Sequence, residues 1–384
     1  MSSFVFRTVP SIVNESGSVS RIGEIISSLG HKTVLVVSDQ GIVNAGLLEK
    51  LILGLNSSGI DHATYTDIDP DPKERMVNEA ASIAVEKKSD CIIGIGGGSV
   101  LDVAKAASVI AYGKCELTEI YGIDQIKSER LPLVLIPTTA GTGSEVTCSS
   151  VISSEGGQKN VAIDPTLYAD MAILDDEMLA TTPKHIISTT GVDAMVHAIE
   201  AYTSATKKNP ISDMLACEAL RLLMGNIEDA YNGSESKSSR SAMLLGAMLA
   251  GQAFANSNVS AVHGFAYALA EKFHLPHGLS NALVLIHILR FNISKALSSY
   301  SSLAKALFPE MIEKDDKEAV DYFLEKIEKI LKSVDLNKNL RDFEIKECDL
   351  DHLANLASKQ ERLIGNNPCF INYEDSVKIF RNAY

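Results

Sequence analysis

Short apolar runs alternate with helical periodicities over the first 180 residues of the chain. Apolar, β-branched-rich segments of strand length occur at 33–39, 91–97, 131–138 and 171–175. Between them, apolar positions recur at helical spacing in 45–55 and 73–88. This alternation predicts a mostly parallel sheet with helices on both faces, in which ligands bind beyond the carboxyl ends of the strands.

After about residue 183 the pattern changes to long helical periodicity. In the segment 320–334, for example, the apolar residues recur so that they share one helix face. Pro183 interrupts the preceding element. We therefore predict an α/β domain over 1–182 and an all-helical domain over 183–384. Because no Gly/Ser-rich linker separates them, we expect the two to pack with the active site in the cleft between them.

Composition narrows the classes of partner. The 384 residues are 46% apolar, and the formal net charge of −14 gives no general attraction for nucleic acid. No uninterrupted apolar stretch approaches the roughly 18–20 residues of a membrane span, and no secretory signal is expected at the start. The six cysteines are scattered without a CxxC pair, which favours free thiols in the cytoplasm.

A glycine-rich segment, GIGGGSVLDVAK at 94–105, follows a predicted strand and opens a helix. Its glycines let a phosphate approach the backbone, and the helix start offers free N–H groups to an anion. We expect Ser99 to cap this helix, with Asp102 completing a capping box. The alternative is a tight turn without a ligand. The candidate residues for binding a nucleotide here are Gly96, Gly97, Gly98, Ser99 and Asp102.

A second loop, PTTAGTGSEVT at 137–147, also follows a strand and is rich in hydroxyl groups. It suits phosphate or amide recognition, although an ordinary polar loop has the same composition. Asp39 ends an earlier strand, where a carboxylate can accept hydrogen bonds from a ribose 2′-hydroxyl and repel a 2′-phosphate. The sequence therefore favours NAD over NADP. The hydroxyl-bearing candidates are Thr138, Thr139, Thr142, Ser144 and Thr147.

A metal site is the candidate chemistry of the helical half. Asp193 and His197 stand at i and i+4 on one predicted helix face, although a helix with a nearby buried histidine would share this spacing. His263 and His277 each precede a glycine in an apolar segment, where an unpaired imidazole would be costly. One Asp and three His suit Fe²⁺, Zn²⁺ or a similar ion. His274 competes for the third imidazole position, but the Pro/Gly setting favours His277.

Four motifs in order resemble the iron-containing (group III) alcohol dehydrogenase family over nearly the whole chain. They are GGGSVLDVAK, PTTAGTGSEVT, GVDAMVHAIEAYTS and VHGFAYALAEKFHLPHGLSNA. The resemblance implies a Rossmann-like dinucleotide-binding domain with an atypical motif order, followed by a helical metal-binding domain, in a dehydroquinate synthase-like architecture. It also implies a homodimer or larger homo-oligomer.

The resemblance also implies residue roles. Asp193, His197, His263 and His277 would hold Fe²⁺, or alternatively Zn²⁺, while NAD(H) exchanges a hydride with a small alcohol or aldehyde. Lys159 would contact the ribose. Tyr267 stands where many members carry a second histidine proposed to relay protons, and its hydroxyl could substitute. Gly97, Gly98 and Ser99 would meet the pyrophosphate, and Asp39, Asp102, Thr138, Thr139, Thr142 and Thr147 match further nucleotide positions.

Two alternatives remain at this point. A zinc-dependent relative could act on a phosphorylated or polyol substrate, as glycerol dehydrogenase, glycerol-1-phosphate dehydrogenase or dehydroquinate synthase do. The few Lys and Arg residues in the motifs argue against an anionic substrate. A non-enzymatic metal- or nucleotide-binding regulator is the second alternative, and the complete ligand set beside two nucleotide loops argues against it.

Overall fold

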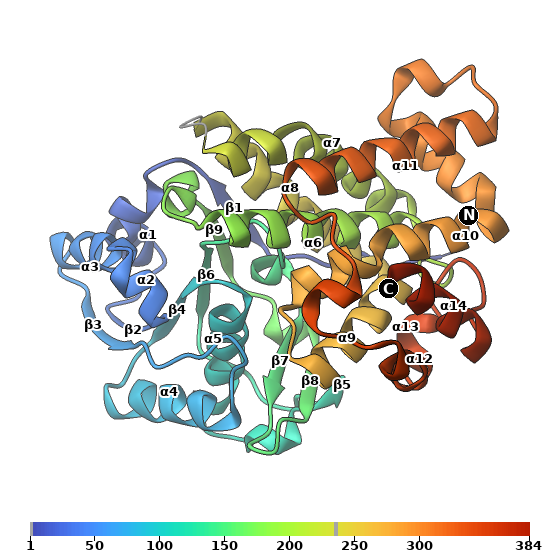
Figure 1. The fold of residues 1–384 in the computed structure, drawn as a ribbon. Helices are drawn as coiled ribbons and strands as arrows, with labels where there is room; N and C mark the ends of the chain where they lie inside the picture. Colours follow the sequence, from blue (N-terminus) through green and yellow to red (C-terminus); the bar gives the residue numbers. More distant parts are fainter. Residues whose placement is uncertain (1–2, 234–236) are drawn as a thin grey trace. The chain divides into compact units, whose positions relative to one another are not determined.

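The computed structural model describes residues 3–233 and 237–384, and these divide into two compact units (Figure 1). The α/β unit comprises Arg7–Thr182. The helical unit comprises Pro183–Tyr384 together with residues 3–6. The predicted change from alternating elements to helices therefore falls at the residue where the structure divides, whereas the first few residues group with the helical unit.

The α/β unit is built on a six-stranded parallel sheet in the order β1-β9-β6-β4-β2-β3. The central strands β2, β4 and β6 are buried on both faces, which explains why they read as continuous apolar runs. The prediction of a mostly parallel sheet is confirmed. The strands are β1 Ser11–Asn14, β2 Thr33–Val37, β3 Asp61–Tyr65, β4 Cys91–Gly96, β6 Leu133–Pro137 and β9 Met171–Leu174.

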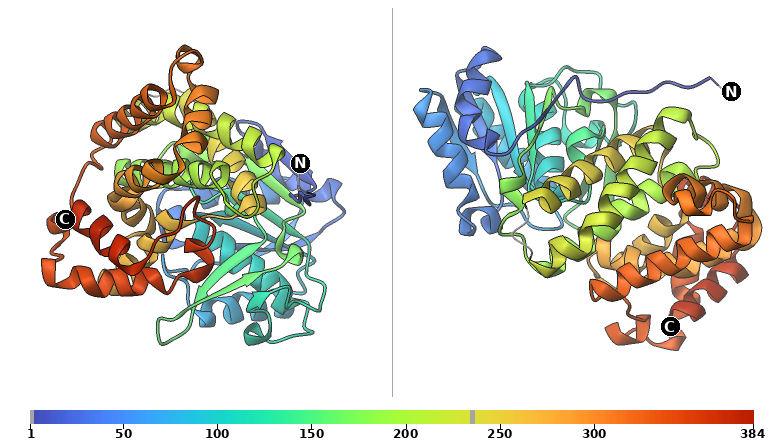
Figure 2. Two further views of the ribbon diagram at one scale, coloured as in Figure 1. Left: turned by 90° about the vertical axis from the view of Figure 1, so that its right-hand side faces the viewer. Right: turned by 90° about the horizontal axis from the view of Figure 1, so that it is seen from above.

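Helices cover both faces of this sheet, as the alternating pattern predicts. Helices α4 and α5 pack against each other on one face, and α1 and α3 pack against each other on the opposite face (Figures 1 and 2). On α4, Met76, Val77, Ala80 and Ala84 form the buried stripe. The helices are α1 Ile22–Ser28, α2 Gln40–Asn44, α3 Leu47–Ser57, α4 Glu74–Glu86 and α5 Gly98–Ala111.

A second, three-stranded sheet lies in the same unit and was not predicted. Its order is β5-β8-β7, with β7 and β8 antiparallel and joined by a short connection. Strands β7 (SSVIS) and β8 (KNVAI) mix polar and apolar residues without regular alternation, which is a weaker signal than the apolar runs of the main sheet. The strands of this sheet are β5 Gly122–Ile123, β7 Ser149–Ser153 and β8 Lys159–Ile163.

The described part of the helical unit contains helices and no strands, as predicted. Helix α6 packs against α7, α8 and α10, and its residues 191–201 are buried all round, so that any ionisable side chain there must find a partner. Its α-helices are α6 Lys184–Tyr202, α7 Pro210–Asn232, α8 Lys237–Ser257, α9 Ala261–Phe273, α10 His277–Leu307, α11 Asp316–Ser333, α12 Leu350–Ser358, α13 Glu361–Ile364 and α14 Tyr373–Ala383.

Within the described residues, only α10 has the length and apolar composition of a possible membrane-spanning helix. Its backbone breaks at Ala296, where φ is −133° and ψ is 40°, so two helical segments meet there at a kink. It packs against α6, α9, α11 and α14, and it buries Asn281 in a hydrogen bond to Asp193 of α6 and Asn292 in a hydrogen bond to Asn367, which follows α13. These are features of a core helix, so its composition is weak evidence for a membrane.

Candidate functional site

Three helices of the helical unit each contribute to one cluster of ionisable side chains. Asp193 and His197 lie one turn apart on the buried middle of α6. His263 is the third residue of α9, and His277 is the first residue of α10. The i, i+4 spacing predicted from the sequence therefore places the first two side chains on one face, and the starts of two further helices bring the other imidazoles to that face.

The ligand atoms of these four residues lie within 4.8 Å of one another. The distances from Asp193 Oδ1 are 3.9 Å to His197 Nε2, 3.7 Å to His263 Nε2 and 3.6 Å to His277 Nε2. A cation about 2.1 Å from each ligand atom would hold those atoms roughly 3 to 4 Å apart. The spacing fits one divalent ion, and one carboxylate with three imidazoles is a donor set for iron or zinc.

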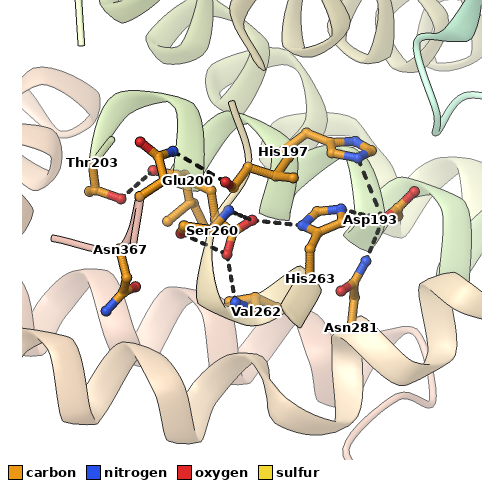
Figure 3. Close-up of polar contacts among 12 residues, drawn as sticks. Asp193, His197, Glu200, Thr203, Ser260, Val262, His263, Asn281 and Asn367 are labelled. Atoms are coloured by element: carbon orange, nitrogen blue, oxygen red, sulfur yellow. Dashed lines mark hydrogen bonds and ion pairs between the residues drawn. The ribbon is translucent and has the colours of Figure 1, made fainter. Parts of the chain in front are cut away.

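The carboxylate of Asp193 is prepared to carry negative charge. Burial raises the pKa of this carboxyl. The three histidines and a hydrogen bond from Asn281 lower it by more, so the pKa lies below its usual value. Asn281 Nδ2 donates to Asp193 Oδ1 at 2.6 Å (Figure 3). Asn281 was not predicted, although its place one turn after His277 on α10 was a usable signal.

Aromatic rings border the cluster. Phe254 stacks on the ring of His197 with centroids 4.3 Å apart, and Tyr267 lies 5.6 Å from the ring of His277. Tyr267 also meets His263 edge-on at 6.5 Å. The side chain of His277 is 33% exposed, against 6% or less for the other three ligands, so the cluster is open on the side of His277. The proton-relay role of Tyr267 stays a prediction.

The competing His274 lies outside the cluster. It ends α9 in the left-handed region, with φ 54°, and is exposed. Pro276 and the start of α10 intervene before His277, which turns back toward Asp193. The preference for His277 in the Pro/Gly setting therefore agrees with the geometry.

In the α/β unit, the predicted nucleotide residues gather at one edge of the sheet. Strands β2, β4 and β6 are parallel neighbours, so Asp39, the glycine loop and the hydroxyl loop all follow carboxyl ends at the same edge. The glycine and hydroxyl loops touch, since a Cβ on Gly98 would lie 2.8 Å from Thr142 Cγ2. The backbone N–H of Thr138 donates to Gly96 O at 3.0 Å. Gly97 lies next to Thr139.

The predicted capping box at the start of α5 is wrong. The helix begins at Gly98, its N-cap is Gly97, and no side chain caps it. Ser99 is already inside the helix and donates through Oγ to Pro70 O at 2.6 Å. Because a glycine and not a serine stands at the N-cap, no side chain occupies the first N–H groups of α5. These groups therefore stay free for an anion.

Asp102 instead belongs to a network around Lys105, a fully buried lysine that was not predicted. Lys105 Nζ donates to Ser144 Oγ at 2.7 Å, to Thr147 Oγ1 at 3.0 Å and to Ser149 O at 2.9 Å. Ser144 Oγ in turn donates to Asp102 Oδ1 at 2.7 Å. The ammonium thus uses all three donors to fix the hydroxyl loop and the start of β7 against α5. Contact of Asp102, Ser144 and Thr147 with a nucleotide stays a prediction.

The two remaining nucleotide candidates lie on different elements. Asp39 caps α2, accepting from the backbone N–H of Ile42 at 3.0 Å. Lys159 is the exposed first residue of β8, and its charge helps to lower the pKa of Asp71, for which burial acts in the opposite sense. Roles of both residues in holding a ribose stay predictions.

Glu145, in the hydroxyl loop, should make the free energy of unfolding depend on pH. Burial raises its pKa from 4.5 to about 7, against the opposing effects of its own backbone N–H and of Lys105. Because the folded state holds this proton more tightly than the unfolded chain, ionisation costs stability as the pH rises from about 4.5 through 7. We expect Glu145→Gln to match the parent at pH 5 and to exceed it by on the order of 2–3 kcal/mol at pH 8.

Urea unfolding of parent and variant at pH 5, 6, 7 and 8 measures this difference. Glu155→Gln, at an exposed position of the same unit, is the control and should track the parent at every pH. A stability gain for Glu145→Gln that is constant from pH 5 to 8 would contradict the titration.

Comparison with known proteins decides the family. The family model of iron-containing alcohol dehydrogenase matches residues 10–176, and that of the Fe-containing alcohol dehydrogenase family, C-terminal, matches residues 187–384. The chain belongs to the iron-containing alcohol dehydrogenase family. The predicted family and the dehydroquinate synthase-like fold are confirmed. The reaction class of alcohol–aldehyde interconversion follows from this membership.

Individual relatives span the whole chain. Long-chain-alcohol dehydrogenase 1 of Geobacillus thermodenitrificans is 34% identical over 371 residues, which are 96% of this chain and 93% of that protein. The crystal structure of a 1,3-propanediol oxidoreductase matches with a TM-score of 0.94 and 29% identity, covering both chains completely. That of sulfoacetaldehyde reductase from Bifidobacterium kashiwanohense in complex with NAD⁺ matches with a TM-score of 0.90 and 25% identity, covering 100% of this chain and 99% of the other.

Proposed function

We propose that this protein is an NAD(H)-dependent, metal-containing dehydrogenase that interconverts a small, uncharged alcohol with its aldehyde or ketone. One observation carries the proposal: a buried carboxylate and three imidazole Nε2 atoms from three helices converge within 4.8 Å. Among these, the buried His263 Nε2 has no hydrogen-bond partner among the described residues, as expected of an atom that serves as a metal donor.

Residues in and around the cluster have separate tasks. A divalent cation bound there would supply Lewis-acid chemistry, favouring the deprotonated alcohol and polarising the carbonyl. Asp193 offsets part of the cation's charge, and Asn281 fixes the orientation of that carboxylate. Phe254 and Tyr267 provide apolar walls that exclude water from the reacting carbon. The Tyr267 hydroxyl would pass the alcohol proton toward solvent on the exposed side of His277.

The carboxyl edge of the α/β sheet would bind the nucleotide. The free N–H groups at the start of α5 and Gly97 and Gly98 would hold the pyrophosphate. The hydroxyl loop would line the nicotinamide half, and Asp39 would accept hydrogen bonds from the adenosine ribose, which favours NAD over NADP. Hydride transfer requires the nicotinamide ring to reach the substrate carbon at the metal centre.

The surroundings of the cluster favour an uncharged substrate. Side chains in contact with its ligands include the aromatic rings of Phe254 and Tyr267, the amide of Asn281 and the carboxylate of Glu200. None of these four groups would offset a phosphate or sulfonate. The relatives are alcohol dehydrogenases and aldehyde reductases, so nothing favours the alternative of a zinc-dependent enzyme for phosphorylated substrates.

Location and assembly are part of the proposal. All six cysteines are free thiols, four of them partly exposed and one exposed, as suits the reducing cytoplasm. A homodimer or larger homo-oligomer is proposed from the resemblance to the family. Size-exclusion chromatography with light scattering measures the oligomeric state.

The test of the reaction is metal-dependent consumption of NADH. The purified protein is stripped of metal, reloaded anaerobically with Fe²⁺ or Zn²⁺, and assayed at 340 nm with short aldehydes, with NADPH in parallel. We expect stripping to lower turnover by at least about a hundredfold and one of the two ions to restore it, with NADH preferred to NADPH. Full occupancy by either ion without turnover of any uncharged aldehyde would overturn the proposal and direct the search to anionic substrates.

A further inference from the structure

Glu200 is a buried carboxylate on the same face of α6 as the two predicted ligands of that helix. It follows His197 by three residues and Asp193 by seven, the spacing of one and two helical turns. Its side chain is only 3% exposed, so its charge must be matched by neighbouring donors. None of the candidate roles derived from the sequence includes it.

Four donors from one short segment meet this carboxylate (Figure 3). Oε1 accepts from Ser260 Oγ at 2.9 Å and from the backbone N–H of Val262 at 2.6 Å. Oε2 accepts from the backbone N–H of Ser260 at 2.8 Å and lies 2.6 Å from His263 Nδ1. Ser260 is the N-cap of α9 but its own side chain does not cap the helix, so Glu200 caps α9 from α6.

The contact with His263 determines which ring nitrogen carries a proton. An ionised carboxylate only accepts hydrogen bonds, so His263 Nδ1 must be the donor. The other three contacts of the Glu200 carboxylate are hydrogen bonds from donors, namely the hydroxyl and backbone N–H of Ser260 and the backbone N–H of Val262, and this arrangement suits an ionised carboxylate. In the neutral ring Nε2 then keeps its lone pair, and this atom lies 3.7 Å from Asp193 Oδ1.

The same carboxylate also orients the ring. It accepts hydrogen bonds from the backbone N–H groups of Ser260 and Val262, three residues and one residue before His263, and it contacts the ring itself. Both the start of the helix and the imidazole plane are therefore fixed relative to α6, which carries two of the other three predicted ligands. A ring fixed at Nδ1 can turn little about its Cβ–Cγ bond without breaking a 2.6 Å hydrogen bond.

We propose that Glu200 is a positioning residue, which selects the Nε2-donor form of His263 and aims that atom at the cation. The inference rests on the proposed function, in which the four-residue cluster holds a divalent ion. Carboxylates that hydrogen-bond to a ligating histidine raise metal affinity by about 10–100-fold in metal sites generally.

Glu200→Gln tests the role, because the amide keeps the size and one acceptor oxygen but loses the charge. Co²⁺ is titrated into metal-free, full-length protein, with visible absorption reporting the geometry of its ligands. We expect the Co²⁺ affinity to fall by about 10–100-fold and the absorption bands to shift. Unchanged affinity with an unchanged spectrum would overturn the positioning role.

Ser260→Ala is the matched control. It removes one hydrogen bond to the same carboxylate and leaves the contact with His263 Nδ1 intact. We expect its Co²⁺ affinity to stay within about twofold of the parent. Equal losses in Ser260→Ala and Glu200→Gln would assign Glu200 a purely structural role at the start of α9. If Glu200→Gln does not fold, judged by circular dichroism, Glu200→Asp replaces it with the same expectation, because the shorter chain withdraws the carboxylate from Nδ1.

A double-mutant cycle tests the role of Glu200 separately from the proposed metal centre. In a His263→Gln background, Glu200→Gln should cause no further loss of Co²⁺ affinity, since the residue acts through His263. A second tenfold loss in that background would contradict the proposed route. A parent protein that binds no Co²⁺ would instead refute the metal centre itself.

Discussion

His263→Ala is expected to lose the bound cation and to lower kcat/KM for alcohol oxidation by at least about a thousandfold, because Lewis-acid stabilisation of several kcal/mol disappears with the metal. His263 is the ligand with the least freedom to be replaced. Its side chain is 2% exposed and its Nδ1 is fixed by Glu200. Water entering the resulting space would have to replace both the ligand and the ring that stacks on His197 at 4.7 Å.

Metal content of the purified variant and initial rates with NAD⁺ and a short alcohol measure the effect. His274→Asn is the matched control, since it removes an imidazole only three residues from His277, and asparagine tolerates the left-handed backbone there. The control should keep its metal and its activity. A His263→Ala variant with near-normal turnover would refute the metal assignment.

The four residues of the proposed metal centre were predictable because each lies on a local signal. Asp193 and His197 are one turn apart within one helix, and Pro276 and Gly278 mark the turn that starts α10 at His277. Only their convergence was non-local. Glu200 has the same helical spacing but was missed. Its role as a hydrogen-bond partner of His263 becomes visible only when the position of α9 beside α6 is known.

In the α/β unit, strands with a local apolar pattern were predicted and strands without one were missed. Strands β2, β4, β6 and β9 were predicted because burial on both faces makes them apolar runs. The four-residue β1 pairs with β9, about 160 positions away, and β3 is a partly exposed edge strand, so neither has a strong local pattern. Lys105 was missed for a related reason: its three acceptors lie about 40 residues further along the chain.

Gly278 gives a physical reason why the Pro/Gly setting of His277 correctly indicated that its side chain lies beside Asp193. A Cβ placed on Gly278 would lie 2.3 Å from Thr189 O and 2.8 Å from Thr189 C, both of them backbone atoms of α6. The first turn of α10 therefore rests directly on the backbone of α6, one turn before Asp193. Only glycine permits this approach, and it sets the distance of His277 from the other ligands.

Gly278→Ala should consequently damage both stability and the metal centre. Because the obstructing atoms are backbone, α10 must move away from α6, at an expected cost of about 3–5 kcal/mol in the free energy of unfolding. His277 moves with it, and a displacement of about 1 Å at a catalytic group costs about a hundredfold in rate. Thermal unfolding, Co²⁺ affinity and kcat/KM measured on one preparation would report the three effects together.

Gly225→Ala distinguishes this contact from the general effect of losing a glycine in a helix. Gly225 lies on the exposed face of α7, where an added Cβ meets nothing within 4 Å. There alanine should stabilise the protein by about 0.5–1 kcal/mol and leave metal affinity and kcat/KM unchanged. If Gly278→Ala behaved like Gly225→Ala, the close approach of α10 to α6 would not be what holds His277 beside Asp193.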